Sequence, residues 1–389
     1  MASSAERSPG RRTVGIVAGE ASGDLLGSQL IGALREIVPQ LHFTGIGGPR
    51  MQSAGMEVLF PLEKLAVRGY LEVARHFWEI LGIRRGLRRR FIAEPPNLFI
   101  GIDAPDFNLG LERSLKAHGI PTVHYVSPAI WMWRGKRIHK IKRAVSKMLT
   151  LFPFEVPVYR QAGIDVAFVG HPLTDILDQV PGRAAAREQL RLPVSATVIA
   201  LLPGSRQSEL EHMADLFVQT AKTISEHAPQ TLFLVPLVTR ETRGMFEAAL
   251  YRNQAGDLPL TVLFGHAQDA MSAADVVLAA SGTATLEAAL LGRPMVITYK
   301  MPAASHWLLK GKGYLPYYGL PNILAGEFVV PEIIQDDATP QNLSQALLNL
   351  LGDAAVRTRL ERKFAAMSAS LQRNAAHRAA LAVLPLLEA

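Results

Sequence analysis

The chain has 389 residues, of which 49% are hydrophobic and 19% charged, and it carries a formal net charge of +7. This length exceeds what one compact core usually holds, so it predicts two domains, and the composition is typical of a soluble globular enzyme. The absence of cysteine excludes disulfides and thiolate metal sites and favours a reducing cytoplasm, and no stretch approaches the ~20 apolar residues of a membrane-spanning helix.

The first half of the chain predicts a parallel sheet. Residues 1–12 are rich in Ser, Arg, Pro and Gly and lack the apolar segment of a signal peptide, so they predict a disordered leader. Short apolar runs then alternate with helical patterns, which is typical of βαβ units. The expected strands are 13–18, 42–46, 97–102, 121–126, 147–151 and 166–169, with helices such as 24–37 and 70–91 between them.

The expected helix 70–91 combines an apolar face, anchored by Phe77 and Trp78, with an arginine cluster that includes Arg85, Arg88 and Arg89. Such a helix is typical of one that lies on an anionic membrane. The alternative is a core-packed helix whose arginines reach past apolar surface to water. Charge favours the membrane, because residues 1–172 carry 23 Lys and Arg against 14 Asp and Glu, whereas the rest carries 18 against 20.

The second half repeats the same architecture. Its expected strands are 197–202, 231–238, 260–264, 275–280 and 294–299, with helices such as 209–227 and 245–252. The segment 170–173 is the expected crossover between one domain at 13–172 and the other at 173–364, and the helical segment 365–389 is expected to pack back on the first domain. The fold class expected is therefore α/β, with two doubly wound Rossmann-like domains. Ligands of such sheets lie beyond the carboxyl ends of the strands, so the two domains are expected to face a cleft.

Polar residues follow the strand ends of the first half. Glu20 comes directly after the first strand and has no evident capping duty, whereas Ser22 and Asp24 beside it are alternatively helix caps. Asp103 ends an apolar strand, and a partly desolvated carboxylate there is suited to taking a proton from an alcohol. Asp106 nearby is alternatively a turn residue.

The segment from His124 to Arg143 is basic and aromatic, and no acidic residue occurs from Arg113 to Phe154. Such side chains bind phosphorylated sugars, lipid headgroups or nucleic acid. For residues 140–147 the alternative, a solvated basic helix face, is favoured.

In the second half, two strands lead through glycine turns into helices. Gly204, Ser205 and Arg206 form the first turn, where Arg206 could grip a diphosphate without a metal or, alternatively, pair with Glu209 on the surface.

The second turn joins the apolar strand 276–280 to a helix through Ser281, Gly282 and Thr283, whose free N–H groups suit a phosphate. Glu287, one helical turn further on, could accept hydrogen bonds from two sugar hydroxyls. The alternative is an ordinary capped helix. In the loop 319–325, Asn322 either reads a nucleobase or phosphate or closes a turn.

Together these loops resemble the lipid-A-disaccharide synthases, which are glycosyltransferases of the two-Rossmann-domain, GT-B type. The segments that carry the resemblance run from the first strand to residue 326, and those of the first domain are the specific ones, because other UDP-sugar enzymes share those of the second. They are 18–27 (AGEASGDLLG), 48–51 (GPRM), 101–108 (GIDAPDFN), 124–128 (HYVSP), 202–206 (LPGSR), 281–287 (SGTATLE) and 320–326 (LPNILAG).

The resemblance implies transfer of 2,3-diacylglucosamine from its UDP derivative to the 6-hydroxyl of 2,3-diacylglucosamine 1-phosphate, giving a β-1′,6 disaccharide and UDP. It implies an inverting reaction that uses no metal and no cofactor. It further implies a cytoplasmic protein that is peripheral on the inner membrane and contacts its anionic lipids. The oligomeric state is left open, a homodimer included.

The resemblance also implies roles for single residues. Asp103 is expected to be the base or to orient the acceptor hydroxyl, with Glu20 as the other candidate. Ser22, Asp106 and His124 are expected near the acceptor or the transferred sugar. The expected UDP-binding residues are Gly204, Ser205, Arg206, Ser281, Gly282, Thr283, Glu287 and Asn322. Residues 300–318 match the family pattern poorly, which leaves any uracil contact there open.

Three other functions remain as alternatives. A UDP-N-acetylglucosamine 2-epimerase would use the same phosphate turn and Glu287 but has no use for a membrane-facing helix. A UDP-sugar transferase with another lipid acceptor is the nearest rival. Nucleic-acid binding is disfavoured, because the basic half lacks a recognisable nucleic-acid module.

Overall fold

The computed structural model describes residues 12–65, 70–131, 135–301 and 316–388, with the side chains of 70–77 left outside that description. Residues 1–11 of the expected leader and residues 302–315 of the segment 300–318 therefore lie outside the described residues. The chain divides into two compact units: unit 1 comprises Met1–Pro172 and Leu371–Ala389, and unit 2 comprises Leu173–Ser370. Both are built on parallel sheets, which confirms the predicted fold class.

In unit 1 the described strands form one parallel sheet in the order β3-β2-β1-β4-β5-β6-β7. Its central strands are apolar and buried along nearly their whole length, because helices cover both faces of a parallel sheet. The strands are β1 (Thr13–Ala18), β2 (His42–Gly47), β3 (Glu57–Pro61), β4 (Leu98–Ile102), β5 (Thr122–Tyr125), β6 (Lys147–Thr150) and β7 (Asp165–Phe168).

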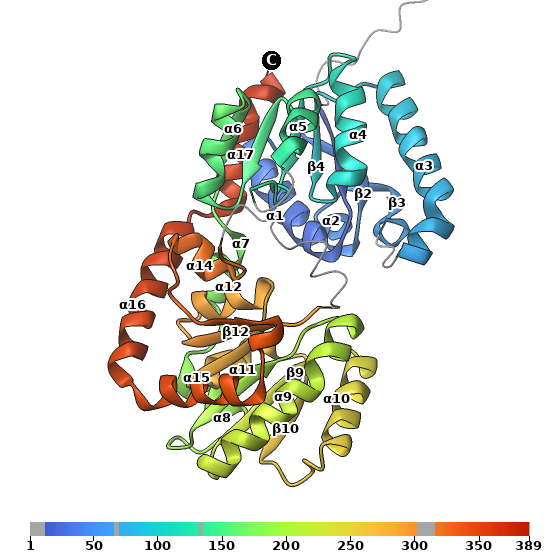
Figure 1. Ribbon diagram of the computed structural model, residues 1–389. Helices are drawn as coiled ribbons and strands as arrows, with labels where there is room; N and C mark the ends of the chain where they lie inside the picture. The colour runs from blue at the N-terminus through green and yellow to red at the C-terminus, as the bar shows by residue number, and fades with distance from the viewer. Residues whose placement is uncertain (1–11, 66–69, 132–134, 302–315, 389) are drawn as a thin grey trace, which may run out of the picture. The chain divides into compact units, whose positions relative to one another are not determined.

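Helices cover the two faces of this sheet and create separate cores. One core joins the sheet to α1 and to the C-terminal α17, which contributes Ala379, Ala380, Val383 and Leu387; in Figure 1 the red α17 packs beside the blue α1. The other core joins the opposite face to α3 and α4. The helices are α1 (Ala21–Ile37), α2 (Pro49–Ser53), α3 (Tyr70–Ala93), α4 (Pro105–Lys116), α5 (Ile138–Ala144), α6 (Val156–Gln161) and α17 (Ala375–Glu388).

Unit 2 holds a second parallel sheet, whose described strands run in the order β10-β9-β8-β11-β12-β13. Its strands β8 and β11 are buried at every residue, and one continuous core surrounds them. The strands are β8 (Val198–Leu202), β9 (Leu232–Leu237), β10 (Leu260–Phe264), β11 (Val276–Ala280), β12 (Met295–Tyr299) and β13 (Glu332–Ile334).

Helices flank this sheet as well (Figure 1). The longest described helix of unit 2 is α9, which is the first element after β8. Unit 2 begins within α7 and ends within α16. The helices are α7 (Pro172–Leu177), α8 (Arg183–Gln189), α9 (Gln207–His227), α10 (Arg240–Arg252), α11 (Ala267–Ala273), α12 (Thr283–Leu290), α14 (Leu320–Ala325), α15 (Pro340–Gly352) and α16 (Ala354–Leu371).

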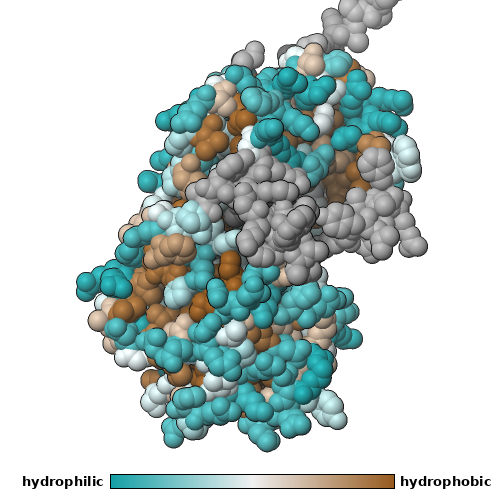
Figure 2. Space-filling model, in the orientation of Figure 1, coloured by the Kyte–Doolittle hydropathy of each residue, from teal (hydrophilic) through white to brown (hydrophobic). Residues whose placement is uncertain are grey.

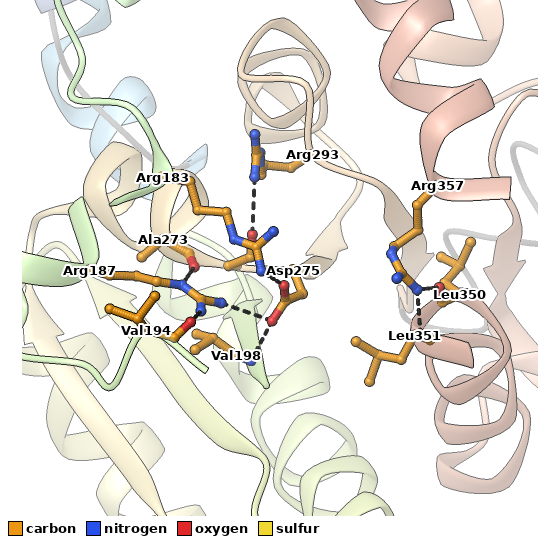
Figure 3. A network of polar contacts seen from close by, with 11 residues as sticks. Arg183, Arg187, Val194, Val198, Ala273, Asp275, Arg293, Leu350, Leu351 and Arg357 are labelled. Atoms are coloured by element: carbon orange, nitrogen blue, oxygen red, sulfur yellow. Dashed lines mark hydrogen bonds and ion pairs between the residues drawn. The ribbon is translucent and has the colours of Figure 1, made fainter. Parts of the chain in front are cut away.

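An arginine network holds the edge of the unit 2 sheet at which the strands begin (Figure 3). Arg187 is 3% exposed and donates to the carbonyl of Ala273 at 2.9 Å and to Asp275 at 2.9 Å. Asp275 in turn accepts from the N–H of Val198 at 2.8 Å. Guanidinium groups thus satisfy the carbonyls at the end of α11, where the helix dipole favours positive charge.

Among the described residues no helix is long and apolar enough to span a membrane. On the face seen in Figure 2, hydrophilic residues cover most of the described surface and leave scattered hydrophobic patches.

Candidate functional site

The candidate acceptor site of unit 1 lies where β4 ends and α4 begins. Asp103 and Ala104 both adopt left-handed backbone conformations, with φ of 49° and 42°. Neither is glycine, so each costs about 1–3 kcal/mol that the surrounding structure must offset. The N–H of Asp103 donates to the carbonyl of Tyr125 at 2.8 Å. Asp103 is half-buried directly after the end of β4.

The side chain of Asn108 restrains this turn through hydrogen bonds to its backbone. Its side-chain amide donates to the backbone carbonyl of Asp103 at 2.9 Å, with longer contacts of 3.4 Å to the carbonyls of Ile102 and Val17. Ala104 is the N-cap residue of α4. Asp106 is exposed on the first turn of α4 and pairs with Arg137.

The loop after β1 adjoins the Asp103 turn. Glu20 is the N-cap residue of α1, but no described side chain caps that helix, so the expected capping by Ser22 or Asp24 does not occur. Glu20 and Ser22 are exposed. Asp24 instead is buried and accepts hydrogen bonds from three N–H groups at the start of α2, those of Gly48 (2.8 Å), Met51 (3.0 Å) and Arg50 (3.1 Å).

His124 lies inside unit 1. Its side chain is fully buried on β5, and its Nδ1 is 2.7 Å from Oε1 of Glu112 on α4. Burial raises the pKa of Glu112, and the neighbouring His124 only partly opposes that rise. The expected contact of His124 with the acceptor stays a prediction, since this conformation directs its described contact to Glu112.

The loop after β5 is tied to a second buried carboxyl group that the sequence did not single out. Glu155 accepts hydrogen bonds from the indole N–H of Trp131 at 3.1 Å and the N–H of Phe152 at 3.2 Å. Burial raises the pKa of Glu155 to about 7. The hydroxyls of Ser127 and Tyr159 are 2.7 Å apart beside it. The available signal was its position as the first acidic residue after Glu112.

In unit 2, the turn between β8 and α9 exposes Arg206. Its guanidinium is 69% exposed and lies 3.7 Å from Oε1 of Glu209, a pair too loose and too hydrated to contribute much. The other Glu209 oxygen accepts from the N–H groups of Ser205 (2.8 Å) and Arg206 (3.2 Å). Gly204 has a φ of +131°, and a Cβ there would lie 2.6 Å from the Cβ of Glu209. The start of α9 is thus filled by its own carboxylate.

The start of α12 differs from that of α9. Gly282 is its N-cap residue, and none of the described side chains caps it. Gly282 and Thr283 are exposed, and the buried strand β11 ends directly before them. The hydroxyl of Ser281 donates to the carbonyl of Tyr318 at 3.2 Å, which braces the turn. The expected free N–H of Ser281 is used within the sheet, because it donates to the carbonyl of Thr298 at 2.9 Å, and that of Thr285 donates to the carbonyl of Gly282 at 3.2 Å. Unlike the start of α9, the start of α12 is not filled by a carboxylate of its own helix among the described contacts, so it suits an anion better.

Glu287 lies one turn further along α12. Burial raises its pKa, and the side-chain amide of Gln268 donates to it at 3.3 Å, which partly offsets the rise. Glu287 as a whole residue is partly exposed. That position suits a hydroxyl ligand.

Asn322 is fully buried in α14, and its side chain is used within unit 2. Its amide N–H groups donate to the carbonyl of Val330 (2.9 Å) and to Glu332 (2.8 Å). Its oxygen accepts from the N–H groups of Val329 (2.8 Å) and Val330 (2.9 Å). The structure gives Asn322 the turn-closing role, and a UDP contact stays a prediction.

The helix α3 separates into two faces. Ile83, Leu87 and Phe91 are buried against the sheet, whereas Trp78 is 72% exposed. Arg85, Arg88 and Arg89 are exposed, and Phe77 lies outside the described side chains. The expected core packing therefore holds for one face, and the other face exposes arginines and Trp78 to solvent. Membrane contact stays a prediction.

Within unit 1, the structure brings Gly19 against Ala104, Asn108 against Asp103, and His124 beside Gly101 on the neighbouring strand. Within unit 2, the turns after β8 and β11 follow two paired strands. Within the described part of the chain, no group of three or more His, Asp or Glu side chains is arranged to hold a metal ion.

Comparison with known proteins supports one family. A family model described as lipid-A-disaccharide synthetase matches residues 14–383. The chain is 56% identical over 376 residues to the lipid-A-disaccharide synthase of Methylobacillus flagellatus, covering 97% of this chain and 100% of that protein. It is 55% identical over 375 residues to that of Dechloromonas aromatica, covering 96% and 98%.

Solved structures share the fold at low identity. A putative UDP-N-acetylglucosamine 2-epimerase from Listeria monocytogenes matches with a TM-score of 0.64 and 12% identity over 91% of both chains. The calicheamicin glycosyltransferase CalG4 matches with a TM-score of 0.61 and 16% identity, over 97% of this chain and 98% of that one. The fold is that of GT-B glycosyltransferases.

Proposed function

Because the chain belongs to the lipid-A-disaccharide synthase family, we propose that it transfers 2,3-diacylglucosamine from its UDP derivative to 2,3-diacylglucosamine 1-phosphate. Membership makes the chain a glycosyltransferase of lipid A disaccharide synthesis that uses a UDP-sugar. The family disfavours the epimerase alternative. The lipid substrates, the individual site residues and the membrane surface are parts of the proposal.

The proposed reaction is a single displacement at the anomeric carbon, with inversion. It needs a base for the acceptor 6-hydroxyl and stabilisation of the departing diphosphate. Asp103 is the proposed base, and the observation that carries this proposal is its left-handed backbone beside a second left-handed residue, Ala104. Strain of this kind persists where the surrounding structure enforces it and is concentrated at functional sites. Glu20, exposed after β1, is the other candidate base.

The donor is proposed to bind at the turns of unit 2. The open N-terminus of α12 would hold a phosphate, and the exposed Arg206 guanidinium would neutralise the diphosphate as it leaves. Glu287 would accept hydrogen bonds from the ribose hydroxyls. Gly204 and Ser205 would act by letting Glu209 fill the start of α9, which leaves the α12 turn as the phosphate site.

The acyl chains of both substrates require access to a lipid surface. We propose that the exposed face of α3, with Trp78, Arg85, Arg88 and Arg89, contacts anionic lipid from the cytoplasmic side of the inner membrane. Phe77 is included by its sequence position alone.

A two-substrate assay tests this function. Purified protein in detergent micelles should release UDP only when the UDP-linked diacylglucosamine and the diacylglucosamine 1-phosphate are both present. UDP release with a water-soluble acceptor, or none with both lipids, would contradict the proposal.

Vesicle flotation tests the surface. Binding to vesicles with anionic lipid should weaken with salt if charge dominates, and should resist high salt if Trp78 inserts. A variant carrying Arg85→Glu, Arg88→Glu and Arg89→Glu should lose flotation and keep its activity in micelles. Unchanged flotation would remove this face from the proposal.

A further inference from the structure

Helix α4 carries two buried polar side chains that fill no capping role. Asn108 and Glu112 are both 0% exposed and lie four residues apart, so they share one face of the helix. A buried amide and a buried carboxyl group cost free energy unless their hydrogen bonds are made, and apolar residues of similar size often serve stability equally well. Their presence therefore calls for a use beyond filling space.

Asn108 acts on the turn that holds Asp103. The strongest contact of its amide is the 2.9 Å hydrogen bond to the Asp103 carbonyl, and the other two reach the strand ends beside it. One side chain thereby restrains the peptide unit at which the backbone turns left-handed. The direction of the Asp103 side chain follows from that backbone conformation.

The Glu112–His124 pair lies directly behind Asn108. His124 on β5 is paired in register with Gly101 on β4, two residues before Asp103. A Cβ at Gly101 would lie 2.2 Å from Oε1 of Glu112 and 2.9 Å from the Cβ of Asn108. These two polar side chains lie so close to β4 that only glycine fits at residue 101, two residues before Asp103.

The group retains hydrogen-bonding capacity beyond what the fold uses. Among the residues that the structure describes, Oδ1 of Asn108, Oε2 of Glu112 and Nε2 of His124 are buried without a partner. Buried atoms of this kind are rare in folded proteins. Three such atoms in one region indicate that these side chains are present to hold the local geometry rather than to stabilise the fold.

We propose that Asn108, supported by the Glu112–His124 pair, is a positioning residue for the Asp103 carboxylate. This inference rests on the proposed role of Asp103. It adds that His124 acts on the acceptor chemistry through Glu112 and Asn108 rather than by contacting the sugar. A displacement of about 1 Å at a reacting group lowers turnover by about 100-fold.

A double-mutant cycle on the full-length enzyme in micelles tests this. Asn108→Leu keeps the number and branching of the side-chain heavy atoms and removes the donor, and it should lower kcat by about 100-fold with unchanged KM for the UDP-sugar. In an Asp103→Asn background, the same change should cause no further loss of kcat, because the carboxylate it positions is gone. Equal losses in both backgrounds would overturn the inference while leaving the proposed function intact.

Two further variants keep the test decisive. Thr122→Val is the matched control, because Thr122 is also fully buried on β5 and its hydroxyl donates to the carbonyl of Ala144 at 2.7 Å, away from Asp103. It should lower the melting temperature and leave kcat unchanged. If Asn108→Leu does not fold, Glu112→Gln replaces it in the same double-mutant cycle. A loss of kcat that occurs only when Asp103 is intact supports the inference. An unchanged kcat, or an equal loss in the Asp103→Asn enzyme, overturns it. Full activity of Asp103→Asn alone would instead refute the proposed base.

Discussion

A Cβ atom on Gly19 would lie 2.4 Å from the Cβ of Ala104. The loop after β1 and the turn after β4 are therefore packed so closely that only glycine fits at residue 19. Because Ala104 follows Asp103 and shares its left-handed conformation, any side chain at residue 19 pushes on the strained pair.

Gly19→Ala should therefore lower kcat strongly while leaving UDP affinity unchanged, because UDP is proposed to bind unit 2. Gly32→Ala is the control: Gly32 lies in α1, and no described atom lies within 4 Å of the Cβ it would gain. That change should raise the stability of α1 by up to about 1 kcal/mol. Steady-state kinetics and UDP titration check both variants, and a Gly19→Ala enzyme of normal kcat would refute the packing argument.

Asp103→Asn and Arg206→Ala should separate the two halves of the reaction. Loss of the base lowers kcat by about 10²–10⁴ and leaves UDP binding intact. Loss of the guanidinium weakens UDP binding by roughly 10–100-fold, the value of one or two hydrogen bonds to a charged group. Arg243→Ala, which breaks an exposed pair with Glu247 on α10, is the control and should change neither quantity. If Asp103→Asn stays fully active, Glu20→Gln is the next variant to measure.

Glu287→Gln distinguishes a hydroxyl ligand from a phosphate ligand. If Glu287 reads the ribose, the variant should bind UDP about 10-fold more weakly and bind inorganic diphosphate as the wild type does. Calorimetry with both ligands measures this. An equal loss for both ligands would mean that Glu287 acts on the α12 turn rather than on the sugar.

Two buried groups should give unit 1 opposing pH dependences. The pKa of Glu155 is raised by burial to about 7 from 4.5, so its contribution to stability is complete below pH 4.5 and is lost as pH rises to 7. The pKa of His171 is lowered by burial to about 4 from 6.5, so its contribution is complete above pH 6.5 and is lost as pH falls to 4. Each is worth about 3 kcal/mol, and the two nearly cancel between pH 4.5 and 6.5.

Single variants should expose each contribution. The stability of Glu155→Gln relative to wild type should rise between pH 4.5 and 7, whereas that of His171→Asn relative to wild type should rise as pH falls from 6.5 to 4. Urea unfolding at four pH values across this range measures both. A difference that is flat with pH would show that the group does not titrate as described.

Arg187 should be a determinant of stability in unit 2. Its buried guanidinium connects α8, the end of α11 and the Asp275 carboxylate (Figure 3), so Arg187→Ala should cost about 3–5 kcal/mol. Arg183 also pairs with Asp275 but is 44% exposed, and Arg183→Ala should cost much less. Thermal unfolding of the two variants, with UDP binding as a check on folded protein, compares them. Equal costs would contradict the network.

The sequence predicted the central strands well, because burial on both faces leaves a continuous apolar run. The segment 13–18 was placed as the structure has it, as β1, and the expected strands 197–202 and 275–280 each begin one residue before β8 and β11. The edge strand β10 was also placed correctly, at 260–264, although it is only partly buried. The edge strands β3 and β13 were missed. Glu57–Pro61 is partly exposed and Glu332–Ile334 has three residues, so neither carries the pattern of a buried strand.

At the candidate sites, strand ends predicted where Glu20, Asp103 and Ser281 lie, because parallel strands all end at one edge of a sheet. What a side chain contacts was harder to predict. The pairing of His124 with Glu112 and the use of Asn322 within its own loop depend on which helix packs over which strand. The spacing of residues in the sequence does not predict such contacts.

The packing of α17 on α1 affects the order in which the chain can fold during synthesis. Residues 12–172 are synthesised before unit 2, yet the core beneath α1 lacks Val383 and Leu387 until α17 has been made. Unit 2 has all its residues by Ser370 and can fold before that moment. The unit that is translated first is therefore the last to be completed, and its half-built core must be kept from aggregating while the other unit forms.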